Sequence, residues 1–313
     1  MHLLSELRYP TRWYSKLIAA LLAISFFIVM AAGIIACYVV YNIIVLPGQK
    51  SEEINLASFP GQPEAIPYEV PGIGPRDGWF FPGLKSAPSI LLCPGYRGSR
   101  EELLPLATAL QDHEYNVFLF DFDRHGDGAG YATFGYRELR ELRAAVAVVA
   151  AREDVDRTRF GLWGTNMGGY TAMAFAESDP RVRAIAVESI YNRPQDMVHL
   201  VVSHNGLGSL PLLRHFAEGS FRLINVRDSY TPALATQVSR LGGVAKLFLE
   251  AADEPDLMQP THDLFMQSPQ PKEEAVLAHG NYAGMLDEEK RTYENRIVSF
   301  FLSNLPPEVR SRP

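Results

Sequence analysis

The amino-acid sequence predicts an α/β fold in which a mostly parallel sheet is covered by helices on both faces and follows one membrane-spanning helix. Three observations support this prediction. Short, apolar runs alternate along the chain with helical patterns, as is typical of buried parallel strands. One such run, residues 160–163, passes through a glycine-rich turn into an alanine-rich helix. Near the N-terminus, residues 17–46 are almost entirely apolar.

The composition fits one sizeable domain with an appendage. The chain has 313 residues, of which 47% are hydrophobic and 21% charged. Its formal net charge of -7 gives no electrostatic reason to expect a nucleic-acid partner. The two cysteines, Cys37 and Cys93, fall in the apolar run and at the end of an expected buried strand, so no disulfide is expected between them.

The apolar run at residues 17–46 exceeds the ~20 residues that a helix needs to cross a bilayer. Arg8, Arg12 and Lys16 precede it, so the positive-inside rule predicts a cytoplasmic segment 1–16 and a periplasmic or extracellular main domain. A cleaved signal peptide is the alternative, because residues 34–37 resemble a lipoprotein cleavage box. The apolar run continues past that point to residue 46, which favours a retained single-pass anchor.

Residues 47–66 are predicted to form a linker before the main domain, and short edge strands are expected after it. Pro82 places the strand at 78–82 near an edge of the sheet. The next apolar run, 89–93, ends at a Pro-Gly pair, and leucines at helical spacing after Ser99 predict a helix at 100–112. Another buried strand is expected at 116–122.

The second part continues the alternation of strands and helices. An amphipathic helix is expected at 135–152, because Leu139, Leu142, Val146 and Val149 share one face. Residues 190–243 show no regular pattern. The remaining elements are expected as strands at 160–163, 182–187, 246–250 and 275–277, helices at 169–177 and 288–305, and a tail at 306–313.

The turn after the strand at 160–163 has the spacing of a nucleophile elbow, G-x-S-x-G. Glycines at 164 and 168 flank the central position at a distance of two residues, which lets a sharp turn pass between strand and helix. The central residue is Asn166 where a serine is expected. Thr165 cannot replace it as the centre, because Trp163 would then occupy a position that must be small.

Several further motifs occur in the order found in one family. Residues 94–99 look like the oxyanion loop H-G-x-x-G-S, residues 121–126 are similar to the turn D-x-R-G-H-G, and residues 134–138 resemble the segment that opens the helix before the elbow. Together they make residues 67–305 resemble the α/β-hydrolase family, in particular its membrane-anchored, serine-aminopeptidase-like and esterase-like branch. By this resemblance, residues 190–243 form the lid.

The resemblance implies a site made of three side chains and two backbone donors. It assigns Asn166 to the nucleophile position, Asp253 to the acid, with Asp256 in reserve, and His279 to the base. The oxyanion donors would be the backbone N–H groups of Tyr96 and Met167. No cofactor is implied. No metal is expected either, since the lid residues His199, His204 and His215 lack the spacing of ligands.

Asn166 leaves the function open, because a carboxamide is a poor nucleophile that a histidine cannot usefully deprotonate. One interpretation is a pseudo-hydrolase that binds a small ligand or a partner. Another is an enzyme for ester, thioester or peptide bonds that works by an unusual route, such as water activated by His279 and Asp253 or deamidation of Asn166 to aspartate. A third is a local or engineered variant of an active serine enzyme.

Overall fold

The protein is described here from a computed structural model. The structure describes residues 13–46, 61, 63–122, 130–204, 211–228 and 231–307. The chain divides into two compact units, one with the described residues of 13–43 and 198–226 and the other with the described residues of 44–197 and 227–307. The larger unit contains the central sheet.

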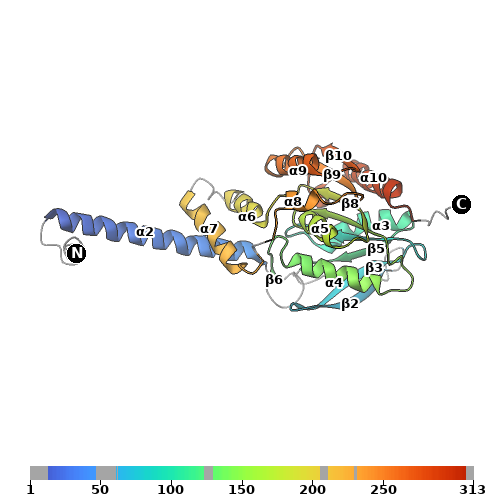
Figure 1. Ribbon diagram of the computed structural model, residues 1–313, viewed down its shortest axis with the longest axis horizontal. Coiled ribbons are helices and arrows are strands. Elements are labelled where there is room, and N and C mark those ends of the chain that lie inside the picture. The colour runs from blue at the N-terminus through green and yellow to red at the C-terminus, as the bar shows by residue number, and fades with distance from the viewer. Residues whose placement is uncertain are drawn as a thin grey trace. The chain divides into compact units, whose positions relative to one another are not determined.

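An eight-stranded sheet forms the centre of the larger unit (Figure 1). Its order from one edge to the other is β2 (Glu64–Val70), β3 (Gly74–Phe81), β5 (Asn116–Phe120), β4 (Ser89–Cys93), β7 (Phe160–Thr165), β8 (Val182–Glu188), β9 (Ala245–Ala251) and β10 (Lys272–Leu277). The pairs β2–β3 and β3–β5 are antiparallel and all the others are parallel. A separate short pair joins β1 (Val45–Leu46) to β6 (Gly130–Tyr131).

Helices cover both faces of this sheet. On one face, α3 (Leu104–Asp112), preceded by the 3-10 turn η2 (Arg100–Leu103), packs with α10 (Asp287–Asn304). The other face is covered by α4 (Glu138–Ala150), α5 (Asn166–Ser178), α8 (Leu234–Val238) and α9 (Pro255–Gln267). Every residue of β4, β5 and β9 is buried as a result, which explains why β4 and β5 are apolar after their first residue.

The structure therefore confirms the predicted fold class, and it corrects some boundaries. The last strand was expected at 275–277, but β10 begins at Lys272 because this edge strand is only partly buried and tolerates charged residues. The helix after the elbow begins at Asn166 itself, not at residue 169. Helix α9 was not expected, since Pro255 and Pro260 interrupt its pattern, although a proline in the first turn is compatible with a helix.

The smaller unit contains a long apolar helix and parts of the expected lid. Helix α2 (Trp13–Ile44) has 32 residues, which corresponds to a length of about 48 Å. Its most apolar stretch is unburied, and its length and composition are compatible with either one membrane span or a signal sequence. The lid range also contains α6 (Pro194–Val202) and α7 (Pro211–Ile224). Within the smaller unit, Sγ of Cys37 lies 3.4 Å from Oγ of Ser220.

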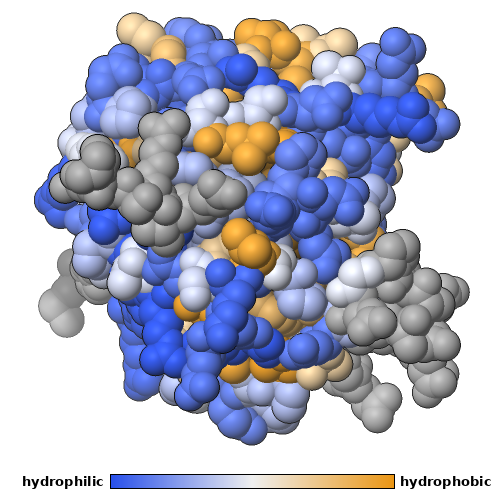
Figure 2. All heavy atoms as spheres, turned by 90° about the vertical axis from the view of Figure 1, so that its right-hand side faces the viewer, coloured by the Kyte–Doolittle hydropathy of each residue, from blue (hydrophilic) through white to orange (hydrophobic). Residues whose placement is uncertain are grey.

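Figure 2 shows one face of the molecule, on which most of the visible side chains are hydrophilic. Hydrophobic side chains form small, separate patches between them. Such a distribution is typical of a protein surface in contact with water.

Both cysteines are free thiols, in agreement with the expectation that they form no disulfide with each other.

Candidate active site

The connection from β7 to α5 is a sharp turn centred on Asn166. Asn166 has a φ of 34°, in the left-handed region that asparagine tolerates better than most residues. A Cβ atom at Gly164 would lie 2.6 Å from the backbone of Gly168, and one at Gly168 would lie 2.2 Å from the carbonyl oxygen of Cys93. Both positions therefore require glycine, which is the reason for the spacing seen in the sequence.

The side chain of Asn166 occupies the two backbone donors predicted for the oxyanion. Its Oδ1 accepts a hydrogen bond from the N–H group of Tyr96 at 2.7 Å and another from the N–H group of Met167. By the resemblance, these donors are the ones predicted to bind the oxyanion of an acyl-transfer intermediate. In this conformation they bind a carbonyl oxygen of the protein itself.

The predicted acid and base lie in the same region but are not joined to each other. Nδ1 of His279 lies 2.9 Å from Oε1 of Glu289 on α10, and this pairing raises the pKa of His279. Oδ1 of Asp253 accepts a hydrogen bond of 2.7 Å from the N–H group of Gly280. Between the described atoms of His279 and Asp253 there is no hydrogen bond. The reserve acid, Asp256, lies in the first turn of α9.

A pocket of about 330 Å³ lies at the carboxyl ends of the parallel strands, beside Asn166. Neither Asp253 nor His279 lines it. The charged or polar residues that line it are Arg97, Ser99, Glu102, Thr165, Asn166, Glu188, Ser189, Glu254 and Asn281. Pockets in open α/β sheets lie at this edge, so its position is that of a ligand site.

Glu188 is a pocket residue that sequence reasoning missed. It ends β8 and is 1% exposed. Its carboxylate accepts hydrogen bonds from the N–H group of Asn281 at 2.9 Å and the hydroxyl of Tyr293 at 2.7 Å. Burial raises its pKa to about 7, and the two hydrogen bonds oppose this shift. The only signal in the sequence is a carboxylate directly after an apolar strand.

The same network continues into the core below the pocket. The indole N–H of Trp163 donates to the hydroxyl of Tyr293 at 3.0 Å, and Tyr293 donates to Glu188. Trp163 and Tyr293 are both buried. This chain of hydrogen bonds fixes the orientation of the Glu188 carboxyl.

The turn expected at 121–126 is described only to residue 122, so the rest of that motif, His125 included, lies outside the described residues.

Comparisons with known proteins agree with this architecture. A family model described as alpha/beta hydrolase fold matches residues 88–208. The Pyrococcus furiosus esterase Pf2001 superposes with a TM-score of 0.64 at 17% identity, covering 84% of this chain and 98% of that chain. The chain has the α/β-hydrolase fold. The order of its strands and the position of its elbow accordingly match the arrangement that this fold uses to present a nucleophile at the top of the sheet.

Similar sequences are also found among curated proteins, most of them named as uncharacterized. The uncharacterized protein YfhR of Escherichia coli O157:H7 is 23% identical over 240 residues, which cover 74% of this chain and 78% of that protein. The polyketide transferase GrgF of a Penicillium species is 31% identical over 111 residues, or 34% of this chain and 38% of that protein. Several of the other matches likewise cover little more than a third of the relative.

Proposed function

We propose that this hydrolase-type protein is a membrane-anchored pseudo-hydrolase, which binds a small ligand beside Asn166 and does not form an acyl-enzyme. One observation carries this proposal: Oδ1 of Asn166 accepts hydrogen bonds from both predicted oxyanion donors, Tyr96 and Met167. Asn166 supplies no serine nucleophile, and its own side-chain oxygen occupies the two donors expected to stabilise the oxyanion intermediate. Loss of the nucleophile alone costs about six orders of magnitude in serine hydrolases.

The positions of the other predicted residues support the same reading. The base of a triad must lie within hydrogen-bond reach of the nucleophile and be oriented by the acid. Here His279 bonds Glu289, while Asp253 bonds the backbone of Gly280. A binding protein does not need these two side chains to meet.

The pocket favours a small polar ligand. Its wall combines the guanidinium of Arg97 with the carboxyls of Glu102, Glu188 and Glu254, so it offers both donors and acceptors. A volume of about 330 Å³ is at the lower end of the range typical of small-molecule sites. The relatives with hydrolase and transferase names make an acyl-containing compound the most natural ligand class.

Covalent labelling with a fluorophosphonate, which reacts with activated serines, tests this proposal. We expect the full-length protein in detergent to remain unlabelled under conditions that fully label a serine esterase, because no serine is activated in the pocket. Two pocket residues are serines, Ser99 and Ser189. Peptide mapping that finds the label on either of them would overturn the pseudo-hydrolase assignment.

A second candidate function rests on Glu188. A carboxyl with a pKa of about 7 that lines the same pocket is poised to act as a general base at neutral pH. It would activate a water molecule in place of a serine. If Glu188 activates water in this way, the native protein hydrolyses esters and Glu188→Gln does not. If the protein is a pseudo-hydrolase, neither hydrolyses esters.

Helix α2 is proposed as a retained anchor, with the N-terminus in the cytoplasm and the main domain periplasmic or extracellular. The basic residues before the apolar run 17–46, Arg8, Arg12 and Lys16, support this orientation. We expect alkaline phosphatase fused after Pro313 to be active and β-galactosidase fused there to be inactive. The reverse pattern would place the main domain in the cytoplasm. Release of the mature domain from the membrane fraction would indicate a cleaved signal.

A further inference from the structure

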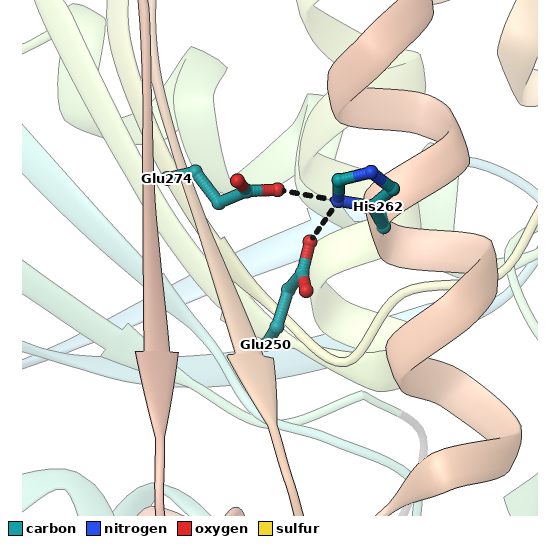
Figure 3. A group of neighbouring side chains, drawn as sticks. All are labelled: Glu250, His262 and Glu274. Atoms are coloured by element: carbon teal, nitrogen blue, oxygen red, sulfur yellow. Dashed lines mark hydrogen bonds and ion pairs between the residues drawn. The ribbon is translucent and has the colours of Figure 1, made fainter.

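Three potential metal ligands converge away from the Asn166 pocket, on the face of the sheet that α9 covers. Figure 3 shows Glu250 of β9, Glu274 of β10 and His262 of α9 pointing toward one another. Nδ1 of His262 lies 3.1 Å from Oε1 of Glu250 and 2.8 Å from Oε1 of Glu274. All three ligand atoms lie within 4.8 Å of one another.

The strand register explains how two carboxylates come together. Strands β9 and β10 are parallel, with Glu274 opposite Phe248 and Val276 opposite Glu250. Because side chains alternate between the faces of a sheet, Glu250 and Glu274 lie diagonally on the same face. Helix α9 connects the two strands and places His262 above them.

With both carboxylates ionised, the cluster has more negative than positive charge. His262 carries at most one positive charge, and its Nδ1 has one hydrogen to share between two carboxylates. The described ion pairs of Glu250 and Glu274 all go to His262. The ammonium group of nearby Lys272 donates instead to the backbone carbonyls of Phe265 and Met266.

Burial makes this imbalance costly. Glu250 is only 3% exposed, and its carboxylate oxygen lies within 4.8 Å of that of Glu274. A second unit of positive charge between them would balance both carboxylates. A divalent cation provides it without adding a proton to either carboxyl.

We propose that Glu250, His262 and Glu274 bind one divalent transition-metal ion, with Zn²⁺ as the model ligand. Bonds of 2.0–2.2 Å to a tetrahedral Zn²⁺ place neighbouring ligand atoms about 3.3 Å apart. The two distances from Nδ1, 3.1 and 2.8 Å, need to lengthen by only a few tenths of an ångström to reach this value. The three side chains also line a cavity of about 490 Å³, which leaves room for water at the remaining position.

The donor set selects the class of ion. An imidazole nitrogen with two carboxylates suits zinc and similar transition metals, whereas Ca²⁺ and Mg²⁺ prefer oxygen ligands alone.

The ion would tie β9, β10 and α9 together. Glu254, which lines the Asn166 pocket, directly precedes α9, so this clamp would also hold that part of the pocket in place.

Zinc titration of the EDTA-treated, full-length protein in detergent, against a chromophoric zinc indicator, tests the proposal. We expect one Zn²⁺ per chain and a loss of affinity of at least about a hundredfold in His262→Ala and Glu274→Gln, because even second-shell changes cost 10–100-fold. Both side chains are partly exposed, 42% and 26%, so these variants should fold. His113→Ala, which removes an exposed histidine distant in sequence from the Glu250–His262–Glu274 cluster, is the matched control and should bind Zn²⁺ as the native protein does.

Two results would refute the metal site. One is the absence of stoichiometric Zn²⁺ binding by the native protein. The other is a His262→Ala variant that binds Zn²⁺ as tightly as the native protein and the His113→Ala control. Circular dichroism of each variant verifies that a loss of binding does not come from unfolding. The titration does not involve the Asn166 pocket, so its failure leaves the proposed function untouched.

Discussion

Replacement of Asn166 by alanine is expected to destabilise the protein by about 2–3 kcal/mol. About 1–2 kcal/mol comes from the N–H groups of Tyr96 and Met167, which lose their shared acceptor. About 1 kcal/mol more comes from placing alanine at a φ of 34°, where asparagine and glycine are tolerated better. Urea unfolding of the full-length protein in detergent measures the total.

Two further variants at the same position separate these contributions. Asn166→Gly relieves the backbone but lacks the acceptor, so it should lose only about 1–2 kcal/mol. Asn166→Asp keeps an oxygen in place, at the N-terminus of α5, where a carboxylate forms stronger hydrogen bonds. At pH 8 it should be at least as stable as the native protein. An aspartate variant as unstable as the alanine variant would show that this oxygen is not the acceptor.

Glu188→Gln is expected to remove a pH dependence of about 3 kcal/mol from the stability of the protein. Glu188 has a pKa of about 7 when folded, against an ordinary value of 4.5. Below pH 4.5 both states hold the proton. As the pH rises toward 7, the unfolded chain releases the proton while the folded protein keeps it, so the free energy of unfolding falls by about 1.4 kcal/mol per pH unit.

Glutamine imitates the protonated carboxyl and has no such titration. Unfolding curves of the native protein and Glu188→Gln, measured between pH 5 and pH 8, should therefore diverge as the pH rises, with the variant relatively more stable at pH 8. Other titrating groups, including Glu250 and His279, are common to both proteins and cancel in the difference. Parallel curves would mean that Glu188 is ionised in the folded protein at pH 5.

The fold could be predicted from the sequence because its signals are local. The continuous apolar runs 90–93 and 117–120 are typical of strands with helices on both faces of a sheet. The elbow could be located because glycines at 164 and 168 have a steric cause, the close approach of β7, α5 and β4. Helix α9 was missed because Pro260 lies inside it, where proline is unusual.

The arrangement of the site depends on contacts that spacing does not reveal. The order of the motifs predicted roles for Tyr96, Met167 and Asn166, but not that the amide oxygen of Asn166 would bind both backbone donors. Glu289, which pairs with His279, belongs to the closing helix and carries no motif. Glu250, His262 and Glu274 come from three elements, and only the parallel register and α9 bring them together.

Hydrolysis of p-nitrophenyl acetate by the full-length protein, beside Asn166→Ala and Glu188→Gln, tests the central claim most directly. We predict that the native protein releases nitrophenol no faster than Asn166→Ala, because Asn166 supplies no nucleophile and occupies the oxyanion donors. Native turnover that disappears in Asn166→Ala would contradict this account, since it would make Asn166 part of a working catalytic site. Turnover lost only in Glu188→Gln would contradict it as well, and would establish the water-activating hydrolase in its place.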